Sequence, residues 1–210
     1  MADQWAEVVK EGEMVGLMMT DLSSAYDMVN FPILQSKLKL FGLDERALKW
    51  METFMFDRKQ STCVDGKMSQ PLTLHQGVPQ GSNLSPFLYI IYTSDVPDLC
   101  HFHPVSSSSP VTYCEDCGSI VSYMDDSSFS VGCESPEALT ERLSQVYKEI
   151  SSYMSSNMLI LNDDKTHLIV FTRKADSDKR EDVYIEAGNH IIRPTATEKL
   201  LGCHVAQDMK

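Results

Sequence analysis

The chain has 210 residues, 42% of them hydrophobic, and a formal net charge of −12 at pH 7. This length and apolar content can bury one core, so we expect a single domain or part of one. The sequence contains no run of about 18 apolar residues that would span a membrane, and no basic and apolar N-terminal signal for secretion. We therefore expect a cytoplasmic or nuclear protein whose six cysteines are reduced or bound to metal.

The acidic balance argues against a whole surface adapted to nucleic acid. The chain has 18 Lys and Arg residues against 30 Asp and Glu residues, and its basic residues form no block. Most sequence-independent affinity for nucleic acid comes from Lys and Arg contacts to phosphates. A role on nucleic acid would therefore draw basic groups from other parts of a larger protein.

The first elements can be placed from apolar runs and helix caps. Residues 15–20 are an unbroken apolar run, typical of a strand buried on both faces, and Asp21 follows directly. Asn30 is suited to cap a helix that ends at Gly42, and Asp44 is suited to cap a second helix.

A turn signal and a proline organise the next part of the chain. We expect a hairpin or short loop around residues 65–66, between strand-like residues 61–64 and 71–74. Residues 76–85 are typical of a loop, and Ser85-Pro86 begins an apolar helix that continues through Tyr92.

The second half mixes strands with one long helix. Residues 120–124 predict a strand that ends at an acidic pair, and Ser135-Pro136 begins a long amphipathic helix. Further strands are expected at 159–161, 168–172, 183–185, 190–193 and 200–205. This order predicts an α+β fold, an antiparallel sheet with helices packed on one face.

Three carboxylates follow predicted strands. Asp21 comes after one, and Asp125 and Asp126 come after another. Phosphoryl transfer from a nucleoside triphosphate commonly uses two metal ions about 3.5–4 Å apart, and magnesium prefers oxygen ligands such as carboxylates. Neighbouring strands would let these residues hold such a pair. Taken alone, an Asp-Asp pair is also an ordinary turn sequence.

Five segments make the catalytic interpretation specific. They read Asp-Leu-Ser-Ser-Ala-Tyr-Asp at 21–27, Gln-Gly-Val-Pro-Gln-Gly-Ser-Asn-Leu-Ser-Pro at 76–86, Tyr-Met-Asp-Asp at 123–126, Asn-Asp-Asp-Lys-Thr at 162–166 and Leu-Leu-Gly at 200–202. In order and in residues they resemble the motifs of reverse transcriptases, most closely those of non-LTR retrotransposons. The resemblance covers nearly the whole chain and implies a polymerase palm that synthesises DNA on an RNA or DNA template.

The resemblance also implies the catalytic and metal-binding residues. Asp21 and Asp125 would bridge two Mg²⁺ ions, and Asp126 would be a third ligand or a structural residue. The substrates would be a primed RNA or DNA template and deoxynucleoside triphosphates.

Four further residues match substrate-binding positions of the family. Tyr26 matches the aromatic gate against the sugar, and Gln80 and Gly81 fall beside the incoming nucleotide and template. Lys165 matches the lysine that approaches the pyrophosphate. From the residues alone, Tyr26 is equally a core aromatic and Lys165 equally a solvated turn lysine.

A zinc site is a separate hypothesis for the connection over residues 100–118. Cys100 and His103, with His101 as the competing ligand, precede a Cys-x-x-Cys pair at Cys114 and Cys117. Such spacing suits a tetrahedral Zn²⁺ site, although an exposed loop with free thiols is an equally good interpretation.

The domain prediction is therefore one partial domain. We expect residues 1–210 to be a reverse transcriptase palm with fingers and thumb largely missing, and residues 100–118 to be a zinc-binding insertion within it. Two functions remain open: a polymerase palm, or a catalytically inactive remnant acting as a zinc-stabilised scaffold or interaction module.

Overall fold

The chain forms two compact units. A computed structural model describes residues 2–100, 103–104, 112–114, 118–123, 126–188, 190–200 and 202–207. The first unit, called the sheet unit below, comprises Met1–Ser23, Asp95–Ser155 and Ile160–Lys210. The second, the helical unit, comprises Ser24–Ser94 and Ser156–Leu159.

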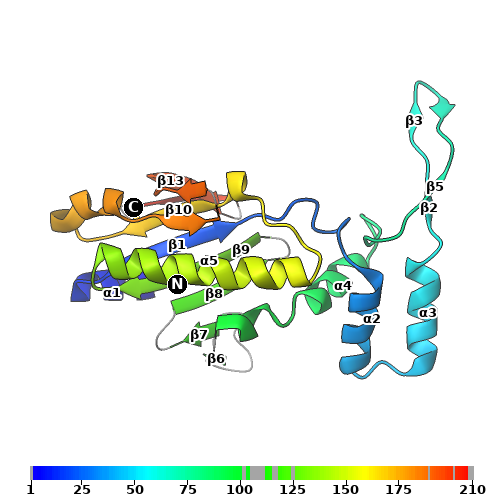
Figure 1. The fold of residues 1–210 in the computed structure, drawn as a ribbon, viewed down its shortest axis with the longest axis horizontal. Coiled ribbons are helices and arrows are strands. Elements are labelled where there is room, and N and C mark those ends of the chain that lie inside the picture. Colours follow the sequence, from blue (N-terminus) through cyan, green and yellow to red (C-terminus); the bar gives the residue numbers. More distant parts are fainter. Residues whose placement is uncertain are drawn as a thin grey trace. The chain divides into compact units, whose positions relative to one another are not determined.

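An antiparallel sheet forms the centre of the sheet unit (Figure 1). Its six described strands lie in the order β10 (His167–Phe171), β1 (Met14–Thr20), β9 (Asp126–Cys133), β8 (Gly118–Tyr123), β7 (Thr112–Cys114) and β6 (His103–Pro104). All seven residues of β1 are buried, as the unbroken apolar run predicts. The expected α+β fold with an antiparallel sheet is confirmed.

One face of this sheet packs against the long helix α5 (Pro136–Ser156), which crosses it in Figure 1. A Cβ atom at Gly16 would lie 2.7 Å from Leu143 Cδ1 and 3.3 Å from Leu139 Cδ1, so the helix meets β1 directly. The predicted apolar stripe of the helix is buried. It consists of Leu139, Leu143, Val146, Ile150 and Met154.

The opposite face is covered by α1 (Ala2–Glu11), a helix that the sequence patterns above do not predict. Trp5 of α1 stacks on Phe171 with ring centroids 5.2 Å apart. The hairpin of β13 (Thr197–Leu200) and β14 (Cys203–Ala206) adds partly buried side chains to this side. The cluster contains Trp5, Val15, Leu17, Met19, Ile169 and Phe171, with Val8, Val9, Leu200 and Val205 against it.

Strand β9 was also not predicted, because its serines hide the apolar pattern. Ser127, Ser128 and Ser130 are buried. Two of these hydroxyl groups are satisfied across the sheet: Ser130 Oγ lies 2.6 Å from Ser119 Oγ, and Ser127 Oγ lies 3.0 Å from Ser122 Oγ. Hydroxyl pairs of this kind make a polar residue compatible with a buried strand.

The C-terminal part of the sheet unit differs from its predicted strands in two places. Residues 159–161 were expected to form a strand, which is wrong, since they contribute one isolated bridge between Leu161 and Leu22. Residues 200–205 were expected to form one strand, but Gly202 separates β13 from β14. The expected strands near 183–185 and 190–193 are the short hairpin β11 (Ile185–Ala187) and β12 (His190–Ile192).

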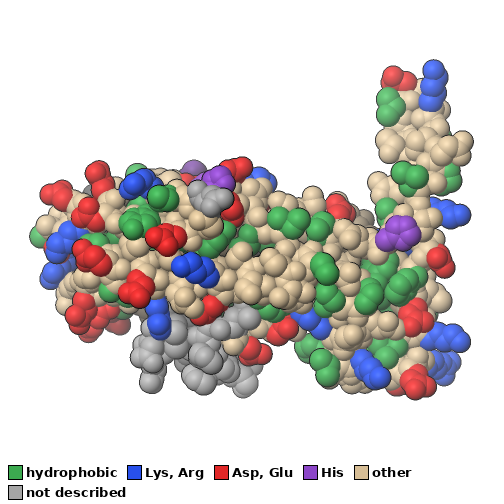
Figure 2. Space-filling model, in the orientation of Figure 1, with side chains coloured by type: hydrophobic (Ala, Val, Ile, Leu, Met, Phe, Trp, Pro, Cys, Tyr) green, Lys and Arg blue, Asp and Glu red, His purple; other side chains and the backbone are tan. Residues whose placement is uncertain are grey.

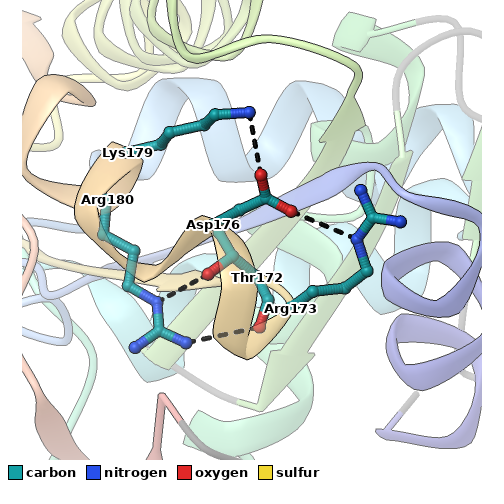
Figure 3. Close-up of polar contacts among 5 residues, drawn as sticks. All are labelled: Thr172, Arg173, Asp176, Lys179 and Arg180. Carbon is teal, nitrogen blue, oxygen red and sulfur yellow. Dashed lines mark hydrogen bonds and ion pairs between the residues drawn. The ribbon is translucent and has the colours of Figure 1, made fainter.

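A 3-10 segment, η3 (Lys174–Asp182), joins β10 to this hairpin. Figure 3 shows its polar contacts, in which Asp176 accepts from Arg173 and pairs with Lys179 at 2.8 Å. Arg180 Nε donates to Thr172 Oγ1 at 2.9 Å, and its Nη2 reaches both Thr172 O and Gln207 O. Arg180 therefore ties the end of β10 to the end of the β13–β14 hairpin.

The helical unit contains α2 (Phe31–Leu40), α3 (Glu45–Met55) and α4 (Ser85–Tyr92). Both predicted caps are confirmed: Asn30 Oδ1 accepts from Ile33 N at 3.2 Å, and Asp44 Oδ1 accepts from Ala47 N at 2.8 Å. The Tyr92 hydroxyl at the end of α4 accepts from Asn30 N at 3.2 Å and so joins α4 to the start of α2.

The predicted hairpin around residues 65–66 exists with a different pairing. β3 (Cys63–Val64) pairs with β4 (Lys67–Met68), and β2 (Lys59–Gln60) pairs with β5 (Leu72–Thr73). Two further short 3-10 turns complete the described elements of the chain, η1 (Val96–Cys100) and η2 (Asp163–Lys165).

Candidate active site

The sheet brings two of the predicted carboxylates to one edge. β1 and β9 are antiparallel, and Thr20 at the end of β1 pairs with Ser127 near the start of β9. Asp21 and Asp126 are the next residues outward on the two strands. They line one hollow of about 230 Å³. The expectation that the strands before Asp21 and before the acidic pair are neighbours is wrong, because β9 lies between β1 and β8 and Asp126 is the first residue of β9.

Basic side chains line the same hollow. Lys165, His167 and Lys199 face it together with the two aspartates. Lys165 Nζ lies 3.0 Å from Asp21 Oδ2, and the Lys165 side chain is 65% exposed whereas that of Asp21 is 26% exposed. His167 Nδ1 lies 3.3 Å from Glu198 Oε1 of β13. The hollow thus combines acidic groups, suited to cations, with basic groups, suited to phosphates.

Lys165 is held near Asp21 by its own backbone. Asn162 N donates to Asp21 O at 2.9 Å, and Ser23 N donates to Ile160 O at 2.9 Å, so the two segments run side by side. Lys165 N in turn donates to Asn162 O at 3.1 Å, which closes the η2 turn. The match of Lys165 to a functional position and its place beside Asp21 are therefore independent observations.

The third predicted carboxylate, Asp125, lies outside the described residues, as does Met124. The described pairing of β8 with β9 extends to Tyr123 and Asp126. Within the described part of the chain, no three Asp, Glu, His or Cys residues gather as a metal site. Asp21 and Asp126 form the described pair.

The zinc hypothesis falls on residues that the structure does not describe. Cys117 and the alternative ligand His101 lie outside the described residues, and so do the side chains of Cys100, His103 and Cys114. The zinc site stays a prediction of the sequence.

In the helical unit, the first and second motifs are joined by backbone hydrogen bonds. Val78 N donates to Tyr26 O at 2.8 Å, and Gly77 N donates to Val29 O at 2.8 Å. Gln80 Nε2 lies 3.1 Å from both oxygens of Asp27. Gln80 is therefore oriented by Asp27, although the two residues are 53 positions apart in the chain.

Tyr26 and Gly81 have different local environments in this unit. The ring of Tyr26 stacks on Tyr89 of α4 with centroids 5.1 Å apart, and Tyr26 is half-buried. Gly81 has a φ of +81°, which favours glycine, and nothing among the described residues lies within 4 Å of the position a Cβ would take. The backbone angle accounts for this glycine, and the predicted close approach of a nucleotide stays a prediction.

Arg58 lies at a larger hollow of the helical unit, about 650 Å³, which residues 76–80 also line. Its guanidinium donates to Gly77 O and to Met55 O, and lies 5.6 Å from the centre of the Phe31 ring. Burial lowers the pKa of Arg58 from its usual value. Arg58 therefore binds the backbone of the second motif at Gly77, a role that no spacing in the sequence predicts.

The surface carries charged side chains of both signs. Figure 2 shows acidic and basic side chains interspersed on the visible face of the sheet unit. Among the described helices, none is long and apolar enough to cross a membrane.

Comparisons with known proteins agree with the motifs. The profile of the family described as "Reverse transcriptase (RNA-dependent DNA polymerase)" matches residues 4–205. The chain belongs to the reverse transcriptase family.

Relatives of this reverse transcriptase chain are proteins of mobile elements. It is 28% identical over 158 residues to the RNA-directed DNA polymerase from mobile element jockey of Drosophila melanogaster, and 36% identical over 92 residues to that of Drosophila funebris. These matches cover 75% and 44% of this chain. The chain spans only 16% and 10% of the two relatives.

Solved telomerase structures share the fold. The telomerase of Candida tropicalis, in complex with a fragment of telomeric RNA, aligns with a TM-score of 0.61 at 14% identity. The alignment covers 100% of this chain and 32% of the telomerase chain. A likeness at this identity shows a common fold, the palm of reverse transcriptases.

Proposed function

We propose that this chain is the palm of an RNA-directed DNA polymerase of a non-LTR mobile element. In this proposal the palm transfers nucleotides to a primer 3′-hydroxyl at the hollow between β1 and β9. The observation that carries the proposal is the pairing of Thr20 with Ser127, which brings Asp21 and Asp126 to one edge in a family whose motifs they match.

The donor set suits Mg²⁺. Carboxylate oxygens are the ligands that magnesium prefers, and it usually keeps several waters and binds substrate phosphates. A hollow of about 230 Å³ has room for hydrated ions, since a water takes about 30 Å³. Asp21, Asp125 and Asp126 would hold the two ions, which lower the pKa of the attacking hydroxyl and neutralise charge on the leaving group.

Lys165 would act on the pyrophosphate. Lys165 Nζ lies 3.0 Å from the Asp21 carboxylate, and it would leave this contact if Asp21 held a divalent cation, since like charges repel. The lysine can then turn toward the departing pyrophosphate and give it a charge or a proton. Lys165 is exposed and reaches this position from a backbone turn tied to Asp21, which supports the role.

Tyr26, Gln80 and Gly81 would contact the nucleotide. Their match to the family motifs supports this assignment, and Asp27 orients the Gln80 amide. In this proposal Tyr26, stacked on Tyr89, packs against the sugar and disfavours a 2′-hydroxyl. The template and primer would draw their phosphate contacts mainly from other parts of a longer protein, since this chain has a net charge of −12.

Primer extension tests the proposal. A labelled DNA primer on an RNA template, with Mg²⁺ and one matched deoxynucleotide, should gain one residue. Asp21→Asn and Asp125→Asn should each slow this step by about 100-fold or more, because a lost metal ligand removes several kcal/mol of transition-state stabilisation.

Asp65→Asn is the matched control. Asp65 lies exposed in the β3–β4 turn with a φ of +49°, which Asn also adopts readily. This variant should extend the primer like the unmodified chain. No extension by the unmodified chain would contradict the proposal and leave the scaffold alternative.

That alternative depends on the zinc prediction. Zinc held by Cys100, His103, Cys114 and Cys117 would tie down the connection over residues 100–118. Metal analysis of the purified chain should find zinc that is lost in a Cys114→Ser, Cys117→Ser double variant. Equal zinc contents would rule out the site.

A further inference from the structure

We propose that Tyr147 of α5 is a positioning residue that holds Lys165 at the catalytic hollow through Asp163. This inference rests on the proposed function, because the role of Lys165 does. Neither Tyr147 nor Asp163 is among the residues that the motifs assign to catalysis.

The contact joins the long helix to the lysine turn. The Tyr147 hydroxyl donates to Asp163 Oδ1, and Asp163 is the first residue of η2, which ends at Lys165. The tyrosine is 5% exposed and sits on the buried stripe of α5. The backbone that carries the Tyr147 phenol is therefore held in place, since α5 packs on the sheet at Gly16.

The turn has two anchors, one on each side. Asn162 N donates to Asp21 O at 2.9 Å, which ties the turn to the end of β1. Asp163 is tied to α5 by Tyr147. The turn is also closed from within, because Thr166 N donates to Asp163 O at 3.2 Å and Thr166 Oγ1 donates to Asn162 O at 3.0 Å. Lys165 is the one side chain of this turn that reaches the Asp21 carboxylate.

The chemistry of the pair suits a permanent anchor. A hydrogen bond to a charged carboxylate is stronger than one between neutral groups. Burial first, and then the Asp163 carboxylate, raise the pKa of Tyr147 well above its ordinary value of 10. The phenol therefore remains a proton donor to Asp163 throughout the neutral and mildly alkaline range.

Helix α5 carries a matched control for this pair. Tyr153, six residues further along and also buried, donates its hydroxyl to Asp95 Oδ1. Tyr153→Phe thus removes the same type of hydrogen bond from the same helix without touching the lysine turn. A purely structural effect of losing a buried tyrosine–aspartate bond would appear in both variants.

The kinetic test is a double-mutant cycle in single-nucleotide addition. Tyr147→Phe should lower kcat about 10-fold with the KM for deoxynucleotide changed less than about twofold, while Tyr153→Phe should change both less than about twofold. Tyr147→Phe should have almost no further effect in a Lys165→Ala background, because it acts through that lysine. An equal loss in both backgrounds, or an equal loss from Tyr153→Phe, would overturn the proposal.

Asp163 supplies a rescue experiment. Asp163→Asn keeps an oxygen that accepts from Tyr147, whereas Asp163→Ala removes it. The asparagine variant should keep most of kcat, and the alanine variant should match Tyr147→Phe. Equal activity in the asparagine and alanine variants would contradict an anchor at this position.

Amide hydrogen exchange tests the same claim without catalysis. Tyr147→Phe should speed exchange about 10-fold at Lys165 and Thr166, whose amides donate within the turn, and Tyr153→Phe should leave them unchanged. If the unmodified chain extends no primer, the proposed function fails, and this exchange result alone decides whether Tyr147 anchors the turn. Unchanged exchange in Tyr147→Phe would refute the anchor.

Discussion

Gly77 of the second motif lies in close contact with the backbone of Asp27 in the first motif. It has a φ of +84°, and its amide donates to Val29 O at 2.8 Å. A Cβ atom there would lie 2.8 Å from Asp27 O and 2.9 Å from Asp27 Cα, both of which are backbone atoms. Backbone cannot turn aside as a flexible side chain can, so Gly77→Ala should displace the two motifs from each other.

The cost has two parts that a control separates. A non-glycine residue at positive φ costs about 1 kcal/mol, and overpacking against fixed atoms costs about 1–3 kcal/mol more. Gly77→Ala should therefore lower the free energy of unfolding by about 2–4 kcal/mol. Gly42→Ala should cost about 1 kcal/mol, because Gly42 has a φ of +87° but no described atom within 4 Å of the Cβ position.

Urea unfolding followed by tryptophan fluorescence measures both variants. The sequence has two tryptophans, Trp5 in the sheet unit and Trp50 in the helical unit with both glycines. In a Trp5→Phe background the signal reports the helical unit through Trp50. Equal losses of stability in Gly77→Ala and Gly42→Ala would refute the close contact of Gly77 with the Asp27 backbone.

Three further predictions test the fold around the site. Gly16→Val should lower stability by about 1–3 kcal/mol in thermal unfolding and should cost less in a Leu143→Ala background, since Leu143 Cδ1 occupies the space; an unchanged cost would contradict the packing of α5. Asn30→Ala should cost about 1 kcal/mol in urea unfolding through loss of the helix cap, and no loss would contradict that cap. Because the pKa of Tyr147 is raised in the folded chain, its contribution to stability is complete below pH 10 and is lost as pH rises further. Unfolding measured between about pH 9 and 11 should therefore show a steeper alkaline loss in the unmodified chain than in Tyr147→Phe, and parallel curves would be evidence against the shift.

The sequence predicts the elements whose local signals agree with their packing. The run before Asp21 is a buried strand, Asn30 and Asp44 cap helices, and the apolar stripe from Leu139 lies on the sheet. Each of these rests on a side-chain period or a cap that does not depend on distant parts of the chain.

The elements that were missed depend on partners elsewhere in the chain. Three of the eight residues of β9 are serines, and the pairing of β9 with β8 satisfies the hydroxyl of Ser130. Residues 159–161 are apolar enough for a strand, but instead of a ladder they form an isolated bridge between Leu161 and Leu22 and accept a backbone hydrogen bond from Ser23 N at Ile160 O. Local patterns carry no information about such distant partners, so they could not show either outcome.

The same limit applies to the site. Order and residue identity in the motifs pointed to Asp21, Asp126 and Lys165, and the sheet register then brings them to one hollow. Tyr147 and His167 match no motif. Tyr147 contacts Asp163 and His167 contacts Glu198, and only the folded chain creates these contacts.

Metal binding by the hollow tests the central claim most directly, because it needs neither primer nor template. Mn²⁺ takes the same oxygen ligands as Mg²⁺ and is detected by electron paramagnetic resonance. The unmodified chain should bind Mn²⁺, Asp21→Asn and Asp126→Asn should each weaken binding about 10-fold or more, and Asp65→Asn should leave it unchanged. Equal binding by all four proteins would contradict a shared metal site at the ends of β1 and β9.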